Sequence, residues 1–162
     1  MNCGHFSCQA APHPLTGSWR APVAQVLAGR LLVCGGRDVT FSSSCYSLEG
    51  GNWQPSPDLT TVRAYAASVI LPGSGVMWVT GGLTSHSDYL SSTELLGPKS
   101  HSWRLGPPLP SPLAFHCMAG YNSSHVFLAG GRGRFRASSA AFLSDGERLV
   151  EVRSMIRRDS QN

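Results

Sequence analysis

Short apolar runs alternate with turn-forming residues along most of the chain. Segment 64–105 shows the pattern clearly, with candidate strands at about 64–71, 75–81, 90–96 and 101–105 separated by glycine, proline and serine. These runs have the length of β-strands and are rich in Val, Leu, Trp and Thr, which favour strands. No segment shows the spacing of apolar residues that an amphipathic helix requires. The pattern therefore predicts an all-β protein with many turns.

A glycine pair follows an apolar run at three places. The pairs are Gly35-Gly36, Gly81-Gly82 and Gly130-Gly131, which gives a period of nearly 50 residues. Glycine suits the end of a strand where the backbone turns sharply, approaches another backbone closely or adopts a positive φ. We therefore expect each pair to end the second strand of a repeated unit.

Aromatic positions complete the repeat. Trp53 and Trp103 each stand before a Pro-rich turn, and Leu149 takes the corresponding place in the third unit. Tyr46 and Phe142 lie in the run that follows the glycines, where the second unit lacks an aromatic residue. Together with the glycine pairs, these marks resemble the kelch repeat over about five-sixths of the chain. We expect the two tryptophans to fill the space between neighbouring repeats.

The kelch resemblance implies a β-propeller in which each repeat forms one four-stranded blade. The expected fold is a propeller fragment of three antiparallel blades, at about 20–55, 60–105 and 110–156. An irregular segment 1–19 precedes the blades and a basic polar tail 157–162 follows them.

Three blades form an open arc, because propellers close with about four to eight blades. Blades at the ends of such an arc expose apolar faces that a neighbour normally covers. We therefore expect the chain to be a piece of a longer kelch protein, or to close its ring with another chain, and we favour the first. An open fragment that pairs edge to edge is a further alternative.

The residue before each glycine pair matches a residue in the following strand. Residues that face each other on antiparallel strands have Cβ atoms about 4.5 to 5.5 Å apart. The expected facing pairs are Cys34 with Cys45, Thr80 with Thr93, and Ala129 with Ala141. The first pair is compatible with a disulfide, and two reduced, buried cysteines are the alternative.

The charge of the chain is unevenly distributed. The formal net charge is +4 at pH 7, and seven arginines lie within 132–158. The segment 130–136, GGRGRFR, is superficially similar to an arginine-glycine nucleic-acid segment, but it lacks interleaved aromatic platforms. Exposed loops and a solvated tail account for the charge, so we expect no nucleic-acid partner. No run reaches the roughly 18 apolar residues of a membrane span.

The cellular compartment stays open. Asn122 starts an Asn-Ser-Ser sequon, which is meaningful only in a secreted protein. A disulfide between Cys34 and Cys45 would also favour an extracellular location. The first thirty residues lack the pattern of a signal peptide, so we expect either a cytoplasmic protein or a chain that is not the complete product. Of the two locations we favour the extracellular one, because of the sequon and the cysteine pair.

Candidate catalytic or metal sites are weak. Cys3, His5, Cys8 and His13 cluster near the N-terminus, but they provide only half of the spacing of a structural zinc site. His116-Cys117 lacks a third member of a nucleophilic set; we expect one of them to pack inward and the other to face outward. No carboxylate pair stands at a catalytic spacing, and no glycine loop precedes a helix. We therefore expect no metal, no cofactor and no enzymatic activity.

The loops between the second and third strands are the best candidates for a binding surface. They span 37–44, 83–89 and 132–138 and carry varied polar residues without a recurring catalytic set. Because most kelch proteins bind proteins, the resemblance implies a non-catalytic interaction module. The candidate contact residues are Arg37, Asp38, His86, Asp88, Arg132 and Arg134.

The alternative function is a fragment of a kelch-type secreted enzyme, either carbohydrate-active or similar to copper-radical oxidases. Such an oxidase gathers tyrosines and histidines around copper, with a cysteine linked to one tyrosine. Tyr46, Tyr65, Tyr121 and His116 form no motif of this kind.

Overall fold

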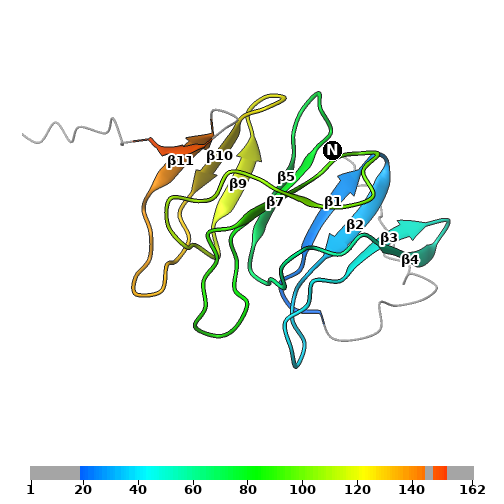
Figure 1. Ribbon diagram of the computed structural model, residues 1–162, viewed down its shortest axis with the longest axis horizontal. Coiled ribbons are helices and arrows are strands. Elements are labelled where there is room, and N and C mark those ends of the chain that lie inside the picture. The colour runs from blue at the N-terminus through cyan, green and yellow to red at the C-terminus, as the bar shows by residue number, and fades with distance from the viewer. Residues whose placement is uncertain (1–18, 145–147, 153–162) are drawn as a thin grey trace, which may run out of the picture.

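The computed structural model of the 162-residue chain describes residues 19–144 and 148–152. Twelve β-strands form three four-stranded antiparallel sheets, and the described residues contain no helix (Figure 1). In each sheet the strands follow one another in sequence order. The structure thus confirms the expected all-β fold of three antiparallel sheets in an open array.

Each sheet is a meander of four short strands. Sheet 1 comprises β1 (Val23–Leu27), β2 (Arg30–Cys34), β3 (Cys45–Glu49) and β4 (Asn52–Ser56). Sheet 2 comprises β5 (Ala67–Ile70), β6 (Met77–Thr80), β7 (Thr93–Leu96) and β8 (Arg104–Leu105). Sheet 3 comprises β9 (Cys117–Gly120), β10 (Val126–Ala129), β11 (Ala141–Ser144) and β12 (Leu149–Glu151).

The first strands of the three sheets lie side by side. β5 contacts both β1 and β9, and the sheets spread from this line (Figure 1). Just before these strands, Ala21, Tyr65 and Phe115 adopt positive φ angles of 51°, 57° and 59°. The backbone N–H of Tyr65 donates to the carbonyl of Ala21 at 3.1 Å, and that of Phe115 to Tyr65 at 3.0 Å. This backbone series holds each sheet to the next.

The glycine pairs end the second strands, as predicted, since β2, β6 and β10 each stop at the preceding residue. All six glycines of the pairs have positive φ, between 59° and 98°. A Cβ on Gly81 would lie 2.2 Å from the carbonyl oxygen of Leu113 in the next sheet's leading segment. A Cβ on Gly35 would lie 2.4 Å from the corresponding oxygen of Arg63. The first glycine of each of these pairs therefore gives the following sheet room to pack.

The predicted register is also confirmed. Cys34 faces Cys45, Thr80 faces Thr93, and Ala129 faces Ala141 in the antiparallel pairs. Cys34 and Cys45 are joined by a disulfide, and both are fully buried.

Two apolar clusters fill the spaces between the sheets. The first lies between sheets 1 and 2, and the second lies between sheets 2 and 3. The first cluster contains Val23, Leu27, Leu32, Cys34, Cys45, Leu59, Met77, Val79, Leu96 and Trp103. The second contains Leu71, Trp78, Leu95, Leu109, Leu113, Val126, Leu128, Phe142 and Leu149. Sheet 2 is thus covered on both faces, and all residues of β6 and β7 are buried.

The two tryptophans do not have the same surroundings. Trp103 is buried in the first cluster, and its Nε1–H donates to the carbonyl of Pro57 at 2.8 Å. Trp53 occupies the equivalent place in sheet 1 but is only half-buried. The expectation that both fill a space between repeats holds for Trp103 and fails for Trp53, because no described sheet lies on that side of sheet 1.

Candidate interaction surface

The three candidate loops lie along one edge of the array (Figure 1, lower edge). Each of the loops 37–44, 83–89 and 132–138 joins the second strand of its sheet to the third. Because the sheets repeat the same antiparallel order, these loops leave their sheets at the same end. The structure therefore groups the candidate residues on one edge.

Arg37 and His86 connect the loops of sheets 1 and 2. The Nη1 of Arg37 lies 3.0 Å from the Nε2 of His86. Because a guanidinium has only donors, the Nε2 of His86 accepts this hydrogen bond. Phe41 lies beside both residues, with the Arg37 guanidinium 5.6 Å above its ring and the His86 ring edge-on at 6.0 Å. Sequence reasoning identified Arg37 and His86 but neither their contact nor Phe41.

The two candidate aspartates have different settings. Asp88 accepts a hydrogen bond of 2.6 Å from the hydroxyl of Thr84, which braces loop 83–89 from within. Asp38 forms the turn of its loop through a backbone N–H that donates to the carbonyl of Thr40 at 3.0 Å. Both side chains are exposed, so they contribute negative charge to the edge.

Loop 132–138 is the basic end of the edge. Arg132, Arg134 and Arg136 are all exposed, and the guanidinium of Arg134 lies 5.6 Å above the ring of Phe135. Phe135 itself is 89% exposed. Val39 on the first loop is 92% exposed. Sequence reasoning missed these two apolar residues, because burial cannot be read from loop composition.

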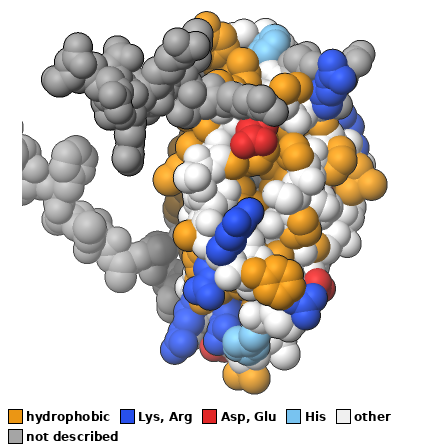
Figure 2. Space-filling model, turned by 90° about the vertical axis from the view of Figure 1, so that its left-hand side faces the viewer, with side chains coloured by type: hydrophobic (Ala, Val, Ile, Leu, Met, Phe, Trp, Pro, Cys, Tyr) orange, Lys and Arg blue, Asp and Glu red, His pale blue; other side chains and the backbone are white. Residues whose placement is uncertain are grey.

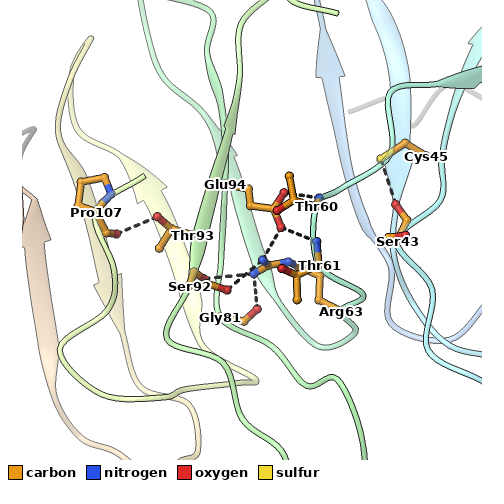
Figure 3. A network of polar contacts seen from close by, with 10 residues as sticks. All are labelled: Ser43, Cys45, Thr60, Thr61, Arg63, Gly81, Ser92, Thr93, Glu94 and Pro107. Atoms are coloured by element: carbon orange, nitrogen blue, oxygen red, sulfur yellow. Dashed lines mark hydrogen bonds and ion pairs between the residues drawn. The ribbon is translucent and has the colours of Figure 1, made fainter. Parts of the chain in front are cut away.

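A buried ion pair holds the segment between sheets 1 and 2 against sheet 2 (Figure 3). The Nη2 of Arg63 lies 2.5 Å from the Oε1 of Glu94, and neither side chain is exposed to solvent. Nη1 of Arg63 also donates to the carbonyl of Gly81 at 2.8 Å, at the start of loop 81–92. Burial lowers the pKa of Arg63, and the neighbouring Glu94 opposes that shift. The backbone N–H groups of Thr60 and Thr61 complete the set by donating to Glu94 at 2.7 and 3.2 Å.

The same two positions carry different pairs in the other sheets. Trp19 and Tyr46 take them in sheet 1, with rings edge-on at 5.5 Å. Leu113 and Phe142 take them in sheet 3, where both are buried in the second cluster. The site of Arg63 is therefore a structural position in the repeat. Aligning the three repeats is the signal that could have found it.

His116 and Cys117 point in opposite directions, as expected. His116 is buried, and its Nε2 lies 2.6 Å from the hydroxyl of Thr80 in sheet 2. Burial lowers the pKa of His116 from 6.5 to about 4. Cys117 is exposed and carries a free thiol. His116 thus forms part of the contact between sheets 2 and 3.

Asn122 lies in the turn between β9 and β10, at the opposite edge from the loops. Its Oδ1 accepts hydrogen bonds from the backbone N–H groups of Ser124 at 3.0 Å and His125 at 2.9 Å. The side chain is half-exposed. A glycan at this position would leave the edge formed by the three loops uncovered.

Several findings bear on the class of protein. Within residues 19–144 and 148–152, no group of three His, Cys, Asp or Glu side chains is arranged to hold a metal. The cluster Cys3, His5, Cys8 and His13 lies outside the described residues, as does the tail 157–162. The described part of the chain also contains no helix suited to a bilayer crossing. No protein-family model matches the chain.

Proposed function

We propose that this chain is a kelch-type β-propeller module that binds a partner protein through the edge formed by loops 37–44, 83–89 and 132–138, without catalysis. The observation that carries the proposal is the grouping of these loops on one edge, with the exposed Val39 and Phe135 among charged residues. Exposed apolar side chains next to arginine are typical anchors of protein interfaces.

The repeat supports the propeller and kelch parts of the proposal. Three sheets of equal strand number follow one another with their first strands side by side. The first two glycine pairs stand where one sheet meets the next, with positive φ and little room for a side chain at Gly35 and Gly81. A radial succession of four-stranded meanders is the plan of a propeller.

The charges of the edge indicate the chemistry of the partner. Arg132, Arg134 and Arg136 stand together on one loop, whereas Asp38 and Asp88 are distributed over the other two. A partner surface with acidic groups around an apolar contact would be complementary to this arrangement. Single-stranded nucleic acid would need several aromatic platforms, and Phe135 is the one large aromatic that is mostly exposed in the three loops.

The oxidase alternative finds no support among the tyrosines. Tyr46 packs edge-on against Trp19, and Tyr65 packs against Phe115 with ring centroids 4.5 Å apart. Tyr121 is 73% exposed in the turn at the opposite edge. These three side chains have separate surroundings, since Tyr46 lies in β3, Tyr65 precedes β5 and Tyr121 follows β9.

The test compares loop and control variants as baits. The loop variant carries Arg134→Glu and Phe135→Ala, and the control carries Arg104→Glu, an exposed arginine on β8 outside the loops. Quantitative mass spectrometry of proteins captured from cell extract should show a set that the wild type and the control retain and the loop variant loses. Thermal melts of all three baits check that the fold is intact. A captured set that is the same for all three baits would contradict the proposal.

A further inference from the structure

Within the described part of the chain, a neighbouring sheet covers only one face of sheet 3. In β10, Val126 and Leu128 are buried in the second cluster, whereas Phe127 between them is 41% exposed. Phe127 pairs with Leu143, and Leu143 pairs with Val150. These three residues form an apolar row on the face that points away from sheet 2. Figure 2 views this side of the molecule and shows hydrophobic side chains across it.

Sheet 1 has a matching row on its own outer face. Leu31 pairs with Leu48, and Leu48 pairs with Trp53. Leu31 is exposed, and the other two side chains are half-buried. Leu32, next to Leu31, belongs instead to the cluster shared with sheet 2. The row Leu31, Leu48 and Trp53 therefore faces away from the rest of the array.

The two open rows correspond to the two sides of the contacts inside the chain. Phe127 and Leu143 occupy the places that Trp78 and Leu95 occupy in sheet 2, where they pack on sheet 3. The equivalents of Leu31, Leu48 and Trp53 in sheet 2 are Met77, Leu96 and Trp103, which pack on sheet 1. The outer face of sheet 3 thus repeats a face that receives the next sheet, and the outer face of sheet 1 repeats a face that packs on the previous one.

The third glycine pair gives an independent indication. Gly35 and Gly81 leave room for a carbonyl of the following sheet, at 2.4 and 2.2 Å from a would-be Cβ. Gly130 has the same positive φ, of 72°, but a Cβ there would meet nothing within 4 Å. The backbone N–H groups of Gly36 and Gly82 donate to the following sheet, whereas that of Gly131 bonds no described residue. The chain keeps at Gly130-Gly131 the geometry that receives another sheet.

We propose that two copies of this chain associate head to tail, with sheet 3 of each copy packed on sheet 1 of the other, to close a ring of six sheets. The inference rests on the proposed propeller architecture, because closed propellers contain about four to eight blades. The two contacts are identical and related by a twofold axis, so the assembly stops at two chains. A second copy presents both the face that sheet 3 needs and the face that sheet 1 needs. Each contact would repeat the packing between sheets that the chain already shows twice.

The first test measures mass and uses two glycine variants. Light scattering coupled to size exclusion should give twice the 17.3 kDa of one chain for the wild type. Gly130→Ala should shift the protein to the monomer, because the new methyl group would meet the backbone of the second copy. The matched control is Gly29→Ala, since Gly29 has a φ of 79° and equally open surroundings but lies in the β1–β2 turn. A wild-type monomer, a dimer unaffected by Gly130→Ala, or an open series of larger species would overturn the proposal.

The second test establishes which faces meet. Inside the chain, Gln25 of β1 donates to the carbonyl of Ser68 of β5 at 2.9 Å. The corresponding positions at the open ends are Ala119 of one copy and Ala24 of the other, both exposed. In a background with Cys3, Cys8 and Cys117 changed to serine, a mixture of Ala24→Cys and Ala119→Cys chains should be linked by a short bismaleimide. Ala24→Cys mixed with Ser74→Cys should not be linked, and equal linking of both mixtures would contradict the head-to-tail contact.

The loop variant separates this proposal from the proposed function. Arg134→Glu with Phe135→Ala lies outside both apolar rows, so it should keep the dimer mass. A dimer that captures no partner through its loops would leave the ring intact and contradict only the binding function. A monomer that still captures partners through its loops would contradict the ring and leave the binding function intact.

Discussion

At the scale of single residues, the two repeat positions that Arg63 and Glu94 occupy in sheet 2 hold a different kind of residue pair in each sheet. Sheet 1 places two aromatic rings there, sheet 2 places the ion pair Arg63–Glu94, and sheet 3 places Leu113 with Phe142. A buried ion pair pays a desolvation cost that good geometry and extra hydrogen bonds offset. The neighbouring sheets indicate that an apolar pair can fill the same space.

Removing one partner of this ion pair should therefore cost far more than replacing both. Arg63→Leu or Glu94→Phe alone leaves an unpaired buried charge, and we expect each to lose about 3 to 5 kcal/mol of unfolding free energy. The double variant copies the pair found in sheet 3 and should be more stable than either single variant, although Thr60 and Thr61 lose their acceptor. Urea unfolding of the four proteins measures the coupling. Additive losses would show that the apolar pair does not substitute for the ion pair.

His116 should make stability depend on pH. Burial lowers its pKa from 6.5 to about 4 in the folded state. Below about pH 6.5 the unfolded chain takes up a proton that the folded chain does not bind, so stability falls as the pH falls toward 4. The stabilisation is fully present above pH 6.5, and the loss across this window reaches about 3 kcal/mol. His116→Gln should remove this part of the pH dependence; parallel profiles of the two proteins would contradict the assignment.

At the scale of elements, the repeat period placed the strands well and their ends less well. All four predicted strands of 64–105 exist, but β5 begins at Ala67 and not at residue 64. The reason is Tyr65, whose positive φ of 57° interrupts the extended backbone. A tyrosine gives no signal of such a conformation, because non-glycine residues rarely adopt it. For the glycine pairs, in contrast, the sequence predicted both their position at the strand ends and their positive φ.

The sequence repeat predicted which loops form the candidate surface, but not the contacts between them. The period identified the loops, and the antiparallel order of strands put them on one edge. The cluster of Arg37, His86 and Phe41 joins loops of two different sheets, so it depends on how the sheets pack. The exposure of Val39 and Phe135 depends on the three-dimensional path of each loop. Both features therefore became visible only in the folded chain.

We expect the disulfide to stabilise sheet 1, although the loop that it closes is short. It joins β2 to β3 across a sequence separation of 11 residues and closes the loop that carries Arg37 and Asp38. Closing a loop of this length restricts the unfolded chain by about 3 kcal/mol in the chain-entropy model. Alanine already fills both positions in sheet 3, so Cys34→Ala with Cys45→Ala is a compatible replacement.

Denaturant unfolding with and without dithiothreitol checks this prediction. The reductant should lower the midpoint of the wild type toward that of the double variant and leave the variant unchanged. A wild type indifferent to the reductant, with full reduction confirmed by mass spectrometry, would show that the disulfide adds nothing to stability.

At the scale of the whole molecule, the three sheets differ mainly in what covers them. The middle sheet is buried on both faces, whereas each outer sheet has one apolar face that no other described sheet covers. A second copy would cover both open faces and give all six sheets equivalent surroundings. It would also place two sets of the loops 37–44, 83–89 and 132–138 around one ring.

Trp53 and Trp103 test this view because they hold the same place in the repeat. Trp103 is buried within one chain, so Trp103→Ala should cost about 3 to 5 kcal/mol at any protein concentration. Trp53 is buried only if the second copy covers it, so the melting temperature of the wild type should rise with concentration. Trp53→Ala should lose most of that rise and cost less stability in dilute protein. Thermal melts over a broad dilution series measure both effects. A wild-type melting temperature independent of concentration would assign Trp53 to an outer surface of a single chain.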